Sequence, residues 1–275
     1  MSSEFEQYAT PLYVQVGDTG QDLLRVHYYE PEGEVKDTLV LLPGFGSLPS
    51  AWDKLLLAMM KDYRIYVIET REKHTAKLGK KPDFSPERFA RDVVDIINYL
   101  MLEDYLMIAS SYGAGFTLLA MSMGILKPRT VYMVGPVLRI EVPNYTWPFV
   151  YIMNRPLWYL FVKPVAKFIL KYIYLDRSQK EQAKKYFGYF DNYNVKRVRK
   201  TMLTQRKFRI TDEQLAKVKG NCIFVAAEKD KAHASDITLG IHKAVKNSKY
   251  YDLETNIAAH SLPLAELIEK LESKK

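Results

Sequence analysis

Short apolar runs alternate with amphipathic stretches along most of the 275-residue chain. Runs that are apolar on both faces are typical of strands inside a parallel sheet, and apolar positions three and four residues apart predict helices. The pattern predicts strands at residues 12–16, 23–29, 38–42, 64–69, 106–109, 130–134, 221–227 and 248–253. Helices are predicted to follow from about residues 50, 86, 111, 234 and 262, with Ser50 and Ser85 capping the first two. This alternation indicates an α/β fold with a mainly parallel sheet covered by helices on both faces.

The alternation stops between residues 135 and 219, where the chain is helical in character, aromatic and basic. We interpret this segment as a cap inserted between two parts of one core, residues 1–134 and 220–275. The net charge of +8 supports that division, because residues 135–210 hold sixteen Lys and Arg against four Asp and Glu. The rest of the chain holds twenty-four against twenty-eight, so the basic character belongs to the cap.

An apolar run at residues 105–109 stops abruptly at two serines, and a helical pattern with small residues follows. A strand, a sharp turn and a helix with a hydroxyl at the apex form a nucleophile elbow. Small residues are needed two before and two after the serine, because the strand and helix backbones approach closely there. Ala109 and Gly113 satisfy this requirement for Ser111, the candidate nucleophile. Ser110 is the rival, but it lacks a glycine two residues later.

A serine hydroxyl needs an adjacent base, and a third group must orient that base. Asp230 follows the strand at 221–227, and His260 lies in a small-residue loop before the last helix. Ser111, Asp230 and His260 thus occur in the order nucleophile, acid, base, each after a strand. Glu228 and Asp236 are alternatives for the acid.

An oxyanion hole requires backbone N–H groups aimed at the developing charge. One is expected from Tyr112, which follows the candidate nucleophile. The other is expected from Phe45, in the loop after the strand at 38–42. Gly44 and Gly46, on either side of Phe45, leave room for a substrate close to the backbone, so we include Gly44 among the substrate-binding candidates.

Together these motifs resemble the α/β-hydrolase family, in its capped branch of esterases, lipases and thioesterases. The resemblance runs from about residue 23 to residue 271. It implies Ser111 as nucleophile, His260 as base, Asp230 as orienting acid and the amides of Phe45 and Tyr112 as oxyanion donors.

The chain departs from the family pattern at three points. Ala109 stands where the family commonly has glycine, and Pro43 stands where histidine is commoner. After the strand at 64–69 the family often has D-x-R-G-x-G-x-S, of which Glu69 and Arg71 match while both glycines are replaced.

The cap is rich in aromatic residues and carries Lys163, Lys167 and Lys171 four residues apart on one helical face. We interpret it as an apolar acyl-binding tunnel under a basic rim, with Trp147 and Trp158 as substrate contacts. Alternatively, the aromatic side chains only pack the cap on the core and the lysines are solvated. A basic rim suits an anionic membrane surface or another anionic head group, such as a CoA phosphate. No nucleic-acid motif accompanies the charge, so no nucleic-acid partner is expected.

Other site classes leave no sequence signature. Cys222 is the only cysteine, so no internal disulfide is possible, and no Cys/His spacing suits zinc. No Gly-rich phosphate loop occurs either, so we predict neither a metal nor a cofactor. The first residues lack the pattern of a signal peptide, which leads us to expect a cytoplasmic protein.

The prediction is a serine hydrolase that cleaves a carboxylic ester or thioester with an apolar acyl group. An acyltransferase would use the same residues but would show acceptor-dependent turnover. A serine-based lyase or C–C hydrolase would be indifferent to simple esters. A non-catalytic ligand-binding protein on this fold is the third alternative, although a binder has no need of a complete triad.

Overall fold

The computed structural model describes residues 3–140, 144–169, 194–229 and 235–273. Its centre is an eight-stranded sheet in the order β1-β2-β4-β3-β5-β6-β7-β8. The strands are β1 (Thr10–Val16), β2 (Asp22–Tyr29), β3 (Asp37–Leu42), β4 (Tyr63–Ile68), β5 (Leu106–Ser110), β6 (Thr130–Val134), β7 (Asn221–Ala226) and β8 (Lys249–Asp252). β1 and β2 pair antiparallel, as do β2 and β4, and all the remaining pairs are parallel. The predicted mainly parallel sheet is confirmed.

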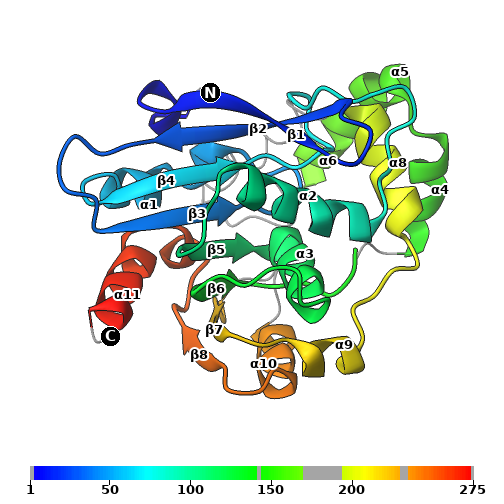
Figure 1. Cartoon of the computed structure of the whole chain (residues 1–275). Coiled ribbons are helices and arrows are strands. Elements are labelled where there is room, and N and C mark those ends of the chain that lie inside the picture. Colours follow the sequence, from blue (N-terminus) through cyan, green and yellow to red (C-terminus); the bar gives the residue numbers. More distant parts are fainter. Residues whose placement is uncertain (1–2, 141–143, 170–193, 230–234, 274–275) are drawn as a thin grey trace.

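Helices cover both faces of this sheet (Figure 1). One face packs against α2 (Pro86–Tyr99), α3 (Ser111–Ser122), α9 (Asp212–Lys217) and α10 (Ser235–Ala244). The other face packs against α1 (Asp53–Met59) and α11 (Leu262–Glu272). Val40 and Leu42 of β3 belong to the first core, whereas Leu39 and Leu41 belong to the second. This division explains why the strand is apolar at successive positions.

The two predicted helix caps have different outcomes. Ser85 caps α2 as predicted, because its hydroxyl accepts a hydrogen bond from the Arg88 amide. The prediction for Ser50 is wrong. Ser50 lies inside a 3-10 turn, η2 (Pro49–Ala51), and α1 begins only at Asp53. Pro49 supplies a fixed φ that starts the turn before the predicted cap.

Between β6 and β7 the described chain is helical. Its elements are η3 (Asn144–Thr146), α4 (Trp147–Ile152), α5 (Arg155–Leu157), the π-helical turn η4 (Trp158–Val162), α6 (Lys163–Ile169), α8 (Val195–Gln205) and α9. Figure 1 shows α4, α5, α6 and α8 on the side toward which β3 and β5 point. The predicted cationic position Lys171 lies outside the described residues. Within the described ranges, the structure contains no helix with the length and apolar character needed to cross a bilayer.

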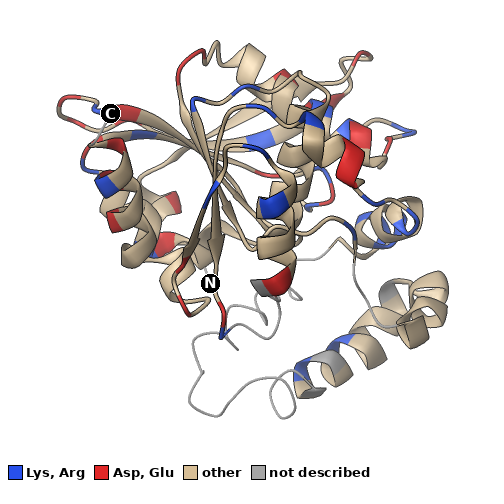
Figure 2. Cartoon of the chain, turned by 90° about the horizontal axis from the view of Figure 1, so that it is seen from below, with Lys and Arg blue, Asp and Glu red and all other residues tan. Residues whose placement is uncertain are grey.

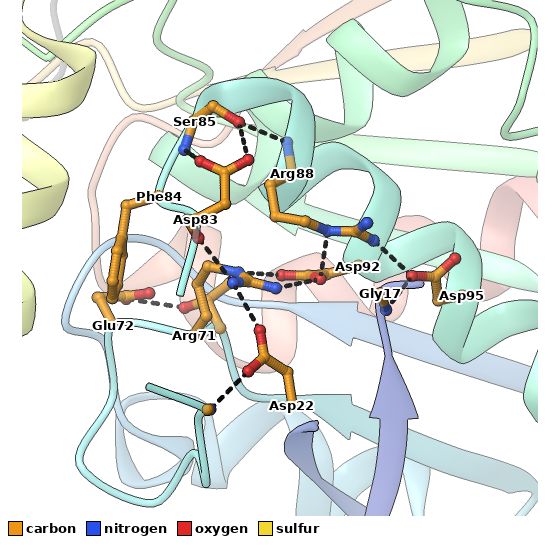
Figure 3. Close-up of polar contacts among 12 residues, drawn as sticks. Gly17, Asp22, Arg71, Glu72, Asp83, Phe84, Ser85, Arg88, Asp92 and Asp95 are labelled. Atoms are coloured by element: carbon orange, nitrogen blue, oxygen red, sulfur yellow. Dashed lines mark hydrogen bonds and ion pairs between the residues drawn. The ribbon is translucent and has the colours of Figure 1, made fainter. Parts of the chain in front are cut away.

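A buried ionic network holds the loop that follows β4 (Figure 3). The Arg71 guanidinium is fully buried and donates to both carboxylate oxygens of Asp92, at 2.5 and 2.6 Å. It also donates to Asp22, next to the β1–β2 turn, and to the carbonyl oxygen of Asp83. Burial alone would lower the pKa of Arg71, but the hydrogen bond to Asp92 and its charge outweigh burial and leave that pKa raised. The loop is thereby tied to both α2 and β2.

Glu69 is a second buried anchor, at the end of β4. Its carboxylate accepts hydrogen bonds from Arg25 at 2.7 Å, from His27 at 2.9 Å and from Thr75. Burial by itself would raise the pKa of Glu69, yet these hydrogen bonds lower it to about 2. Glu6, His27 and Glu69 offer potential metal-ligand atoms within 4.8 Å of one another. However, Arg25 forms ion pairs with both carboxylates, so a side-chain cation already pairs with the cluster.

The junction of β3 and α3 is packed backbone to backbone. A Cβ atom added at Gly113 would lie 2.6 Å from the carbonyl oxygens of both Leu42 and Pro43. That separation is well inside van der Waals contact, so only a hydrogen atom fits there. By contrast, a Cβ atom at Gly240, within α10, would meet nothing within 4 Å.

Gly113→Ala is expected to lower the free energy of unfolding by roughly 1–3 kcal/mol, because overpacking forces the two backbones apart. Gly240→Ala is the matched control and should stabilise the protein by about 0.5–1 kcal/mol, since alanine favours a helix interior. Urea titrations of both variants measure these changes. A Gly113→Ala variant as stable as wild type would contradict the close approach.

Acid is expected to destabilise the wild type more than Glu69→Gln between about pH 4.5 and pH 2. The folded pKa of Glu69, about 2, lies below its ordinary value of 4.5. Its carboxylate therefore stabilises the fold above pH 4.5, and that contribution is lost as pH falls through 2. The full effect is about 3 kcal/mol, at roughly 1.4 kcal/mol per pKa unit.

Urea titrations at a series of pH values test this expectation. Glu32→Gln, an equal change of charge at an exposed position, is the control and should keep the wild-type pH dependence. Identical pH dependence in wild type and Glu69→Gln would refute the assignment.

Candidate active site

Ser111 stands at the turn between β5 and α3. It has a positive φ of 50°, which a residue other than glycine or asparagine rarely adopts. Ser110 is the last residue of β5 and is 5% exposed, whereas Ser111 is half-buried. The turn thus presents one of the two hydroxyls at the carboxyl end of the strand and buries the other residue. The positive end of the helix dipole of α3 also favours negative charge at this point.

The loop after β3 lies directly against Ser111. A Cβ atom at Gly44 would be 3.0 Å from the Ser111 Cβ and 3.6 Å from its Oγ. The backbone that leads into Phe45 therefore passes beside the hydroxyl, as an oxyanion donor at Phe45 requires. Any side chain at position 44 would crowd the serine.

The two predicted oxyanion residues also meet through their side chains. The rings of Phe45 and Tyr112 pack edge to face, with centroids 5.3 Å apart. Tyr112 belongs to a buried aromatic cluster with Phe84, Phe89 and Phe116. This packing connects the loop after β3 to the first turn of α3.

His260 ends the short turn η6 (Ala258–His260), just before α11. Its Nδ1 lies 2.7 Å from the carbonyl oxygen of Asn256. Because a carbonyl oxygen only accepts, Nδ1 is the donor in this contact, and in the neutral ring Nε2 then carries the lone pair that can act as a base. The indole of Trp52 packs against the imidazole, with ring centroids 4.3 Å apart. No pattern in the sequence indicated this contact.

One loop therefore contacts both predicted catalytic side chains. Residues 43–52 meet Ser111 through Gly44 and His260 through Trp52. Asp230, the predicted orienting acid, lies outside the described residues. Its alternatives, Glu228 and Asp236, are both exposed. The backbone amide of Glu228 donates to Asp252, which ties the ends of β7 and β8 together.

Two buried charged residues form hydrogen bonds with the backbone of the loop at residues 43–52. Glu72 is 1% exposed and stands where the family commonly has the first glycine of its motif. Its Oε1 accepts from the Thr70 hydroxyl at 2.7 Å and, at 3.5 Å, from the amide of Gly46. The neighbouring Lys73 is buried, and its ammonium donates to the carbonyl oxygen of Ser47. Burial lowers the pKa of Lys73, and the nearby charge of Glu72 offsets part of that effect.

The last residues and the first turn of α8 contact two other segments, the aromatic cluster around Tyr112 and the loop after β4. The buried Gln205 accepts a hydrogen bond from the Tyr112 hydroxyl and donates to the carbonyl oxygen of Phe84 at 2.8 Å. Burial, with a contribution from the charge of Glu72, raises the pKa of Tyr112 well above its ordinary value, so this hydroxyl stays a donor. Arg197 donates to the carbonyl oxygen of Lys73. No sequence signal marked Gln205 or Arg197, because their partners lie about a hundred residues away.

The two tryptophans proposed as substrate contacts have different surroundings. Trp158 is buried with Met153, Val195 and Val198, and Phe45 packs against this cluster. Trp147 is also buried, but the guanidinium of Arg206 lies 4.8 Å from the centre of its ring. Only Trp158 is thus linked by packing to the loop beside Ser111.

A cavity of about 270 Å³ opens between the loop after β6, α9 and α10. Its lining residues are Val137, Leu138, Arg139, Arg209, Asp212, Leu215, Ile237, Gly240 and Ile241. Neither Ser111 nor His260 is among them. The cavity is therefore distinct from the predicted acyl tunnel.

No protein-family model matches the sequence, and no curated protein matches it. Solved structures do resemble it over nearly their whole length. An esterase from Thermogutta terrifontis gives a TM-score of 0.75 at 12% identity, over 97% of this chain and 99% of that chain. A hydrolase from Pseudomonas aeruginosa gives 0.73 at 14% identity, over 96% and 97%. An enol-lactonase from Burkholderia xenovorans gives 0.73 at 15% identity, over 96% and 98%.

Identities this low establish a shared fold rather than a shared substrate. The strand order, the helices on both faces and these likenesses agree. The chain therefore has the α/β-hydrolase fold, as its sequence motifs predicted.

Proposed function

We propose that the protein is a serine hydrolase that cleaves a carboxylic ester or thioester with an apolar acyl group. The observation that carries this proposal is the setting of Ser111. It combines a positive φ at the β5–α3 junction with direct contact to the Gly44 backbone. A strained apex of this kind persists only where the surroundings hold it, and such strain clusters at functional sites.

His260 would act as the general base. With the Nδ1 proton directed to the Asn256 carbonyl, Nε2 is the nitrogen that can accept the Ser111 proton as the serine attacks the substrate carbonyl. Asp230 would stabilise the imidazolium that forms. The acyl group is then carried on Ser111, and His260 activates a water molecule that releases the acid.

The amides of Phe45 and Tyr112 would bind the tetrahedral oxyanion. Donors of this kind contribute most when they are fixed before the reaction, because no reorganisation is then needed as charge develops. Glu72 and Lys73 form hydrogen bonds with the loop that carries the Phe45 amide, and such contacts would fix this donor before the reaction. The apolar cluster around Trp158, against which Phe45 packs, is a suitable wall for the acyl group.

Two alternatives use the same residues. An acyltransferase would pass the acyl group to an alcohol or thiol, so its turnover would rise with acceptor concentration. A serine-based lyase or C–C hydrolase would leave simple esters intact. The esterase and the enol-lactonase with this fold favour hydrolysis of an ester-type bond as the first reaction to assay.

Ser111→Ala is expected to reduce hydrolysis of nitrophenyl esters by a factor of 10³ or more, since loss of a triad nucleophile costs on that order. Ser110→Ala, one residue away, is the matched control and should keep most of the activity. Rates are measured over a series of acyl chain lengths. Equal losses in both variants, or full activity in Ser111→Ala, would rule out Ser111 as the nucleophile.

Lys73→Met is expected to lower kcat roughly tenfold, about 1.4 kcal/mol, with little change in KM. Methionine fills the same space but cannot donate to the Ser47 carbonyl, so the loop that carries the Phe45 amide loses an anchor. Lys77→Met, at an exposed position of the same segment, should behave as wild type. A folded Lys73→Met variant with unchanged kcat would show that the loop does not depend on this contact.

A further inference from the structure

The segment from η3 to α6 has a second apolar face that points outward. Nine large apolar side chains with at least 47% of their surface exposed are Tyr145, Phe149, Tyr151, Ile152, Tyr159, Leu160, Phe161, Val165 and Phe168. We name these nine residues the cap strip. The same helices bury Trp147, Val150, Met153 and Trp158. The segment therefore has an inner apolar face that is buried and an outer apolar face that is exposed.

Helix α8 and Arg206, which follows it, anchor α4, the helix that carries part of the cap strip. The Arg199 guanidinium donates to the carbonyl oxygens of Val150 and Tyr151. Arg206 donates to the Tyr151 hydroxyl at 2.6 Å and lies over the ring of Trp147. These contacts fix α4 against α8, so its exposed apolar side chains are presented by a packed helix.

The charge around the cap strip has one sign. Between residues 142 and 175 the sequence contains no Asp or Glu, and Lys163 and Lys167 lie on α6 within this stretch. The Lys163 ammonium lies 5.0 Å from the centre of the Tyr159 ring, so cation and aromatic side chain are neighbours. In Figure 2 the helical segment at the lower right accordingly shows blue bands and no red.

We propose that the cap strip docks on the surface of a lipid bilayer that contains anionic headgroups. Apolar side chains bordered by Lys and Arg, without acidic residues, are the composition that lies flat in a membrane interface. Aromatic side chains favour that depth, and each cation near the surface adds attraction to anionic lipid. No residue of the cap strip was assigned to the candidate active site, so the inference goes beyond the proposed hydrolase function and does not depend on it.

A second copy of the chain fits the cap strip less well. A symmetric contact would bring the same surface of two molecules together. Lys163 and Lys167 would then lie near their own copies, and residues 142–175 would bring no acidic residue to that contact. Like charges placed together oppose association, whereas an anionic bilayer complements them.

Sedimentation of the full chain with lipid vesicles tests the proposal. One vesicle preparation is pure phosphatidylcholine, and the other contains equal parts of phosphatidylcholine and phosphatidylglycerol. The wild type should bind the anionic vesicles more tightly than the neutral ones, and added salt should weaken this preference. Lys163→Gln with Lys167→Gln should reduce affinity for the anionic vesicles by about fivefold for each cation removed.

A double variant tests the apolar part of the cap strip. Leu160→Glu with Phe161→Glu should lower vesicle affinity by at least about tenfold, because two inserted side chains become charged. Tyr99→Glu with Met101→Glu is the matched control. It places the same two charges on apolar side chains that are 60% and 84% exposed at the end of α2, and it should leave vesicle binding unchanged.

The proposal is overturned if the wild type binds neither vesicle, or if both double variants bind equally well. It is also overturned if light scattering finds a dimer that Leu160→Glu with Phe161→Glu dissociates, since a second copy would then occupy the strip. Hydrolysis of a short, water-soluble ester is measured in parallel and should be unchanged in that variant. Loss of vesicle binding and failure of the proposed hydrolase function are thus read separately.

Discussion

The candidate site depends on one close approach between two backbones. Gly113, in the first turn of α3, sits so near the carbonyl oxygens of Leu42 and Pro43 that no Cβ atom fits. β3 and β5 are paired neighbours in the sheet, and this contact packs the first turn of α3 against the end of β3, so the loop that leaves β3 runs next to Ser111. The glycine is required by this approach rather than by its own φ, so its role is steric.

The loop of residues 43–52 is the part of the site that joins the rest. It contacts the serine through Gly44 and the imidazole through Trp52. Glu72 accepts a hydrogen bond from the amide of Gly46 in this loop, and Lys73 donates one to the carbonyl oxygen of Ser47. Buried charges of this kind cost desolvation energy, which their hydrogen bonds to the loop offset in part. Here they fix the backbone that would stabilise an oxyanion.

Much of the fold could be predicted from sequence because its signals are local. Continuous apolar runs marked the strands, and the Ser85-Pro86 pair marked the start of α2. Small residues around Ser111 marked the elbow, where φ is positive. The predicted helix cap at Ser50 was wrong because a 3-10 turn that begins at Pro49 precedes α1.

The supports of the site could not be predicted, because each is a contact between distant segments. Glu72 and Lys73 look like a polar surface loop in the sequence, yet both are buried. Gln205 reaches Tyr112 only after the chain has returned through the cap. The Trp52–His260 contact likewise spans most of the chain. Pattern and spacing carry no information about such pairs.

The central claim is that Ser111 is an activated nucleophile, and covalent labelling tests it most directly. A fluorophosphonate reacts with a serine only where a base and an oxyanion site assist. The account predicts a single adduct, mapped by peptide mass spectrometry to Ser111, absent from Ser110 and strongly reduced in His260→Ala. An adduct on another residue, or no adduct in protein that hydrolyses esters, would contradict it.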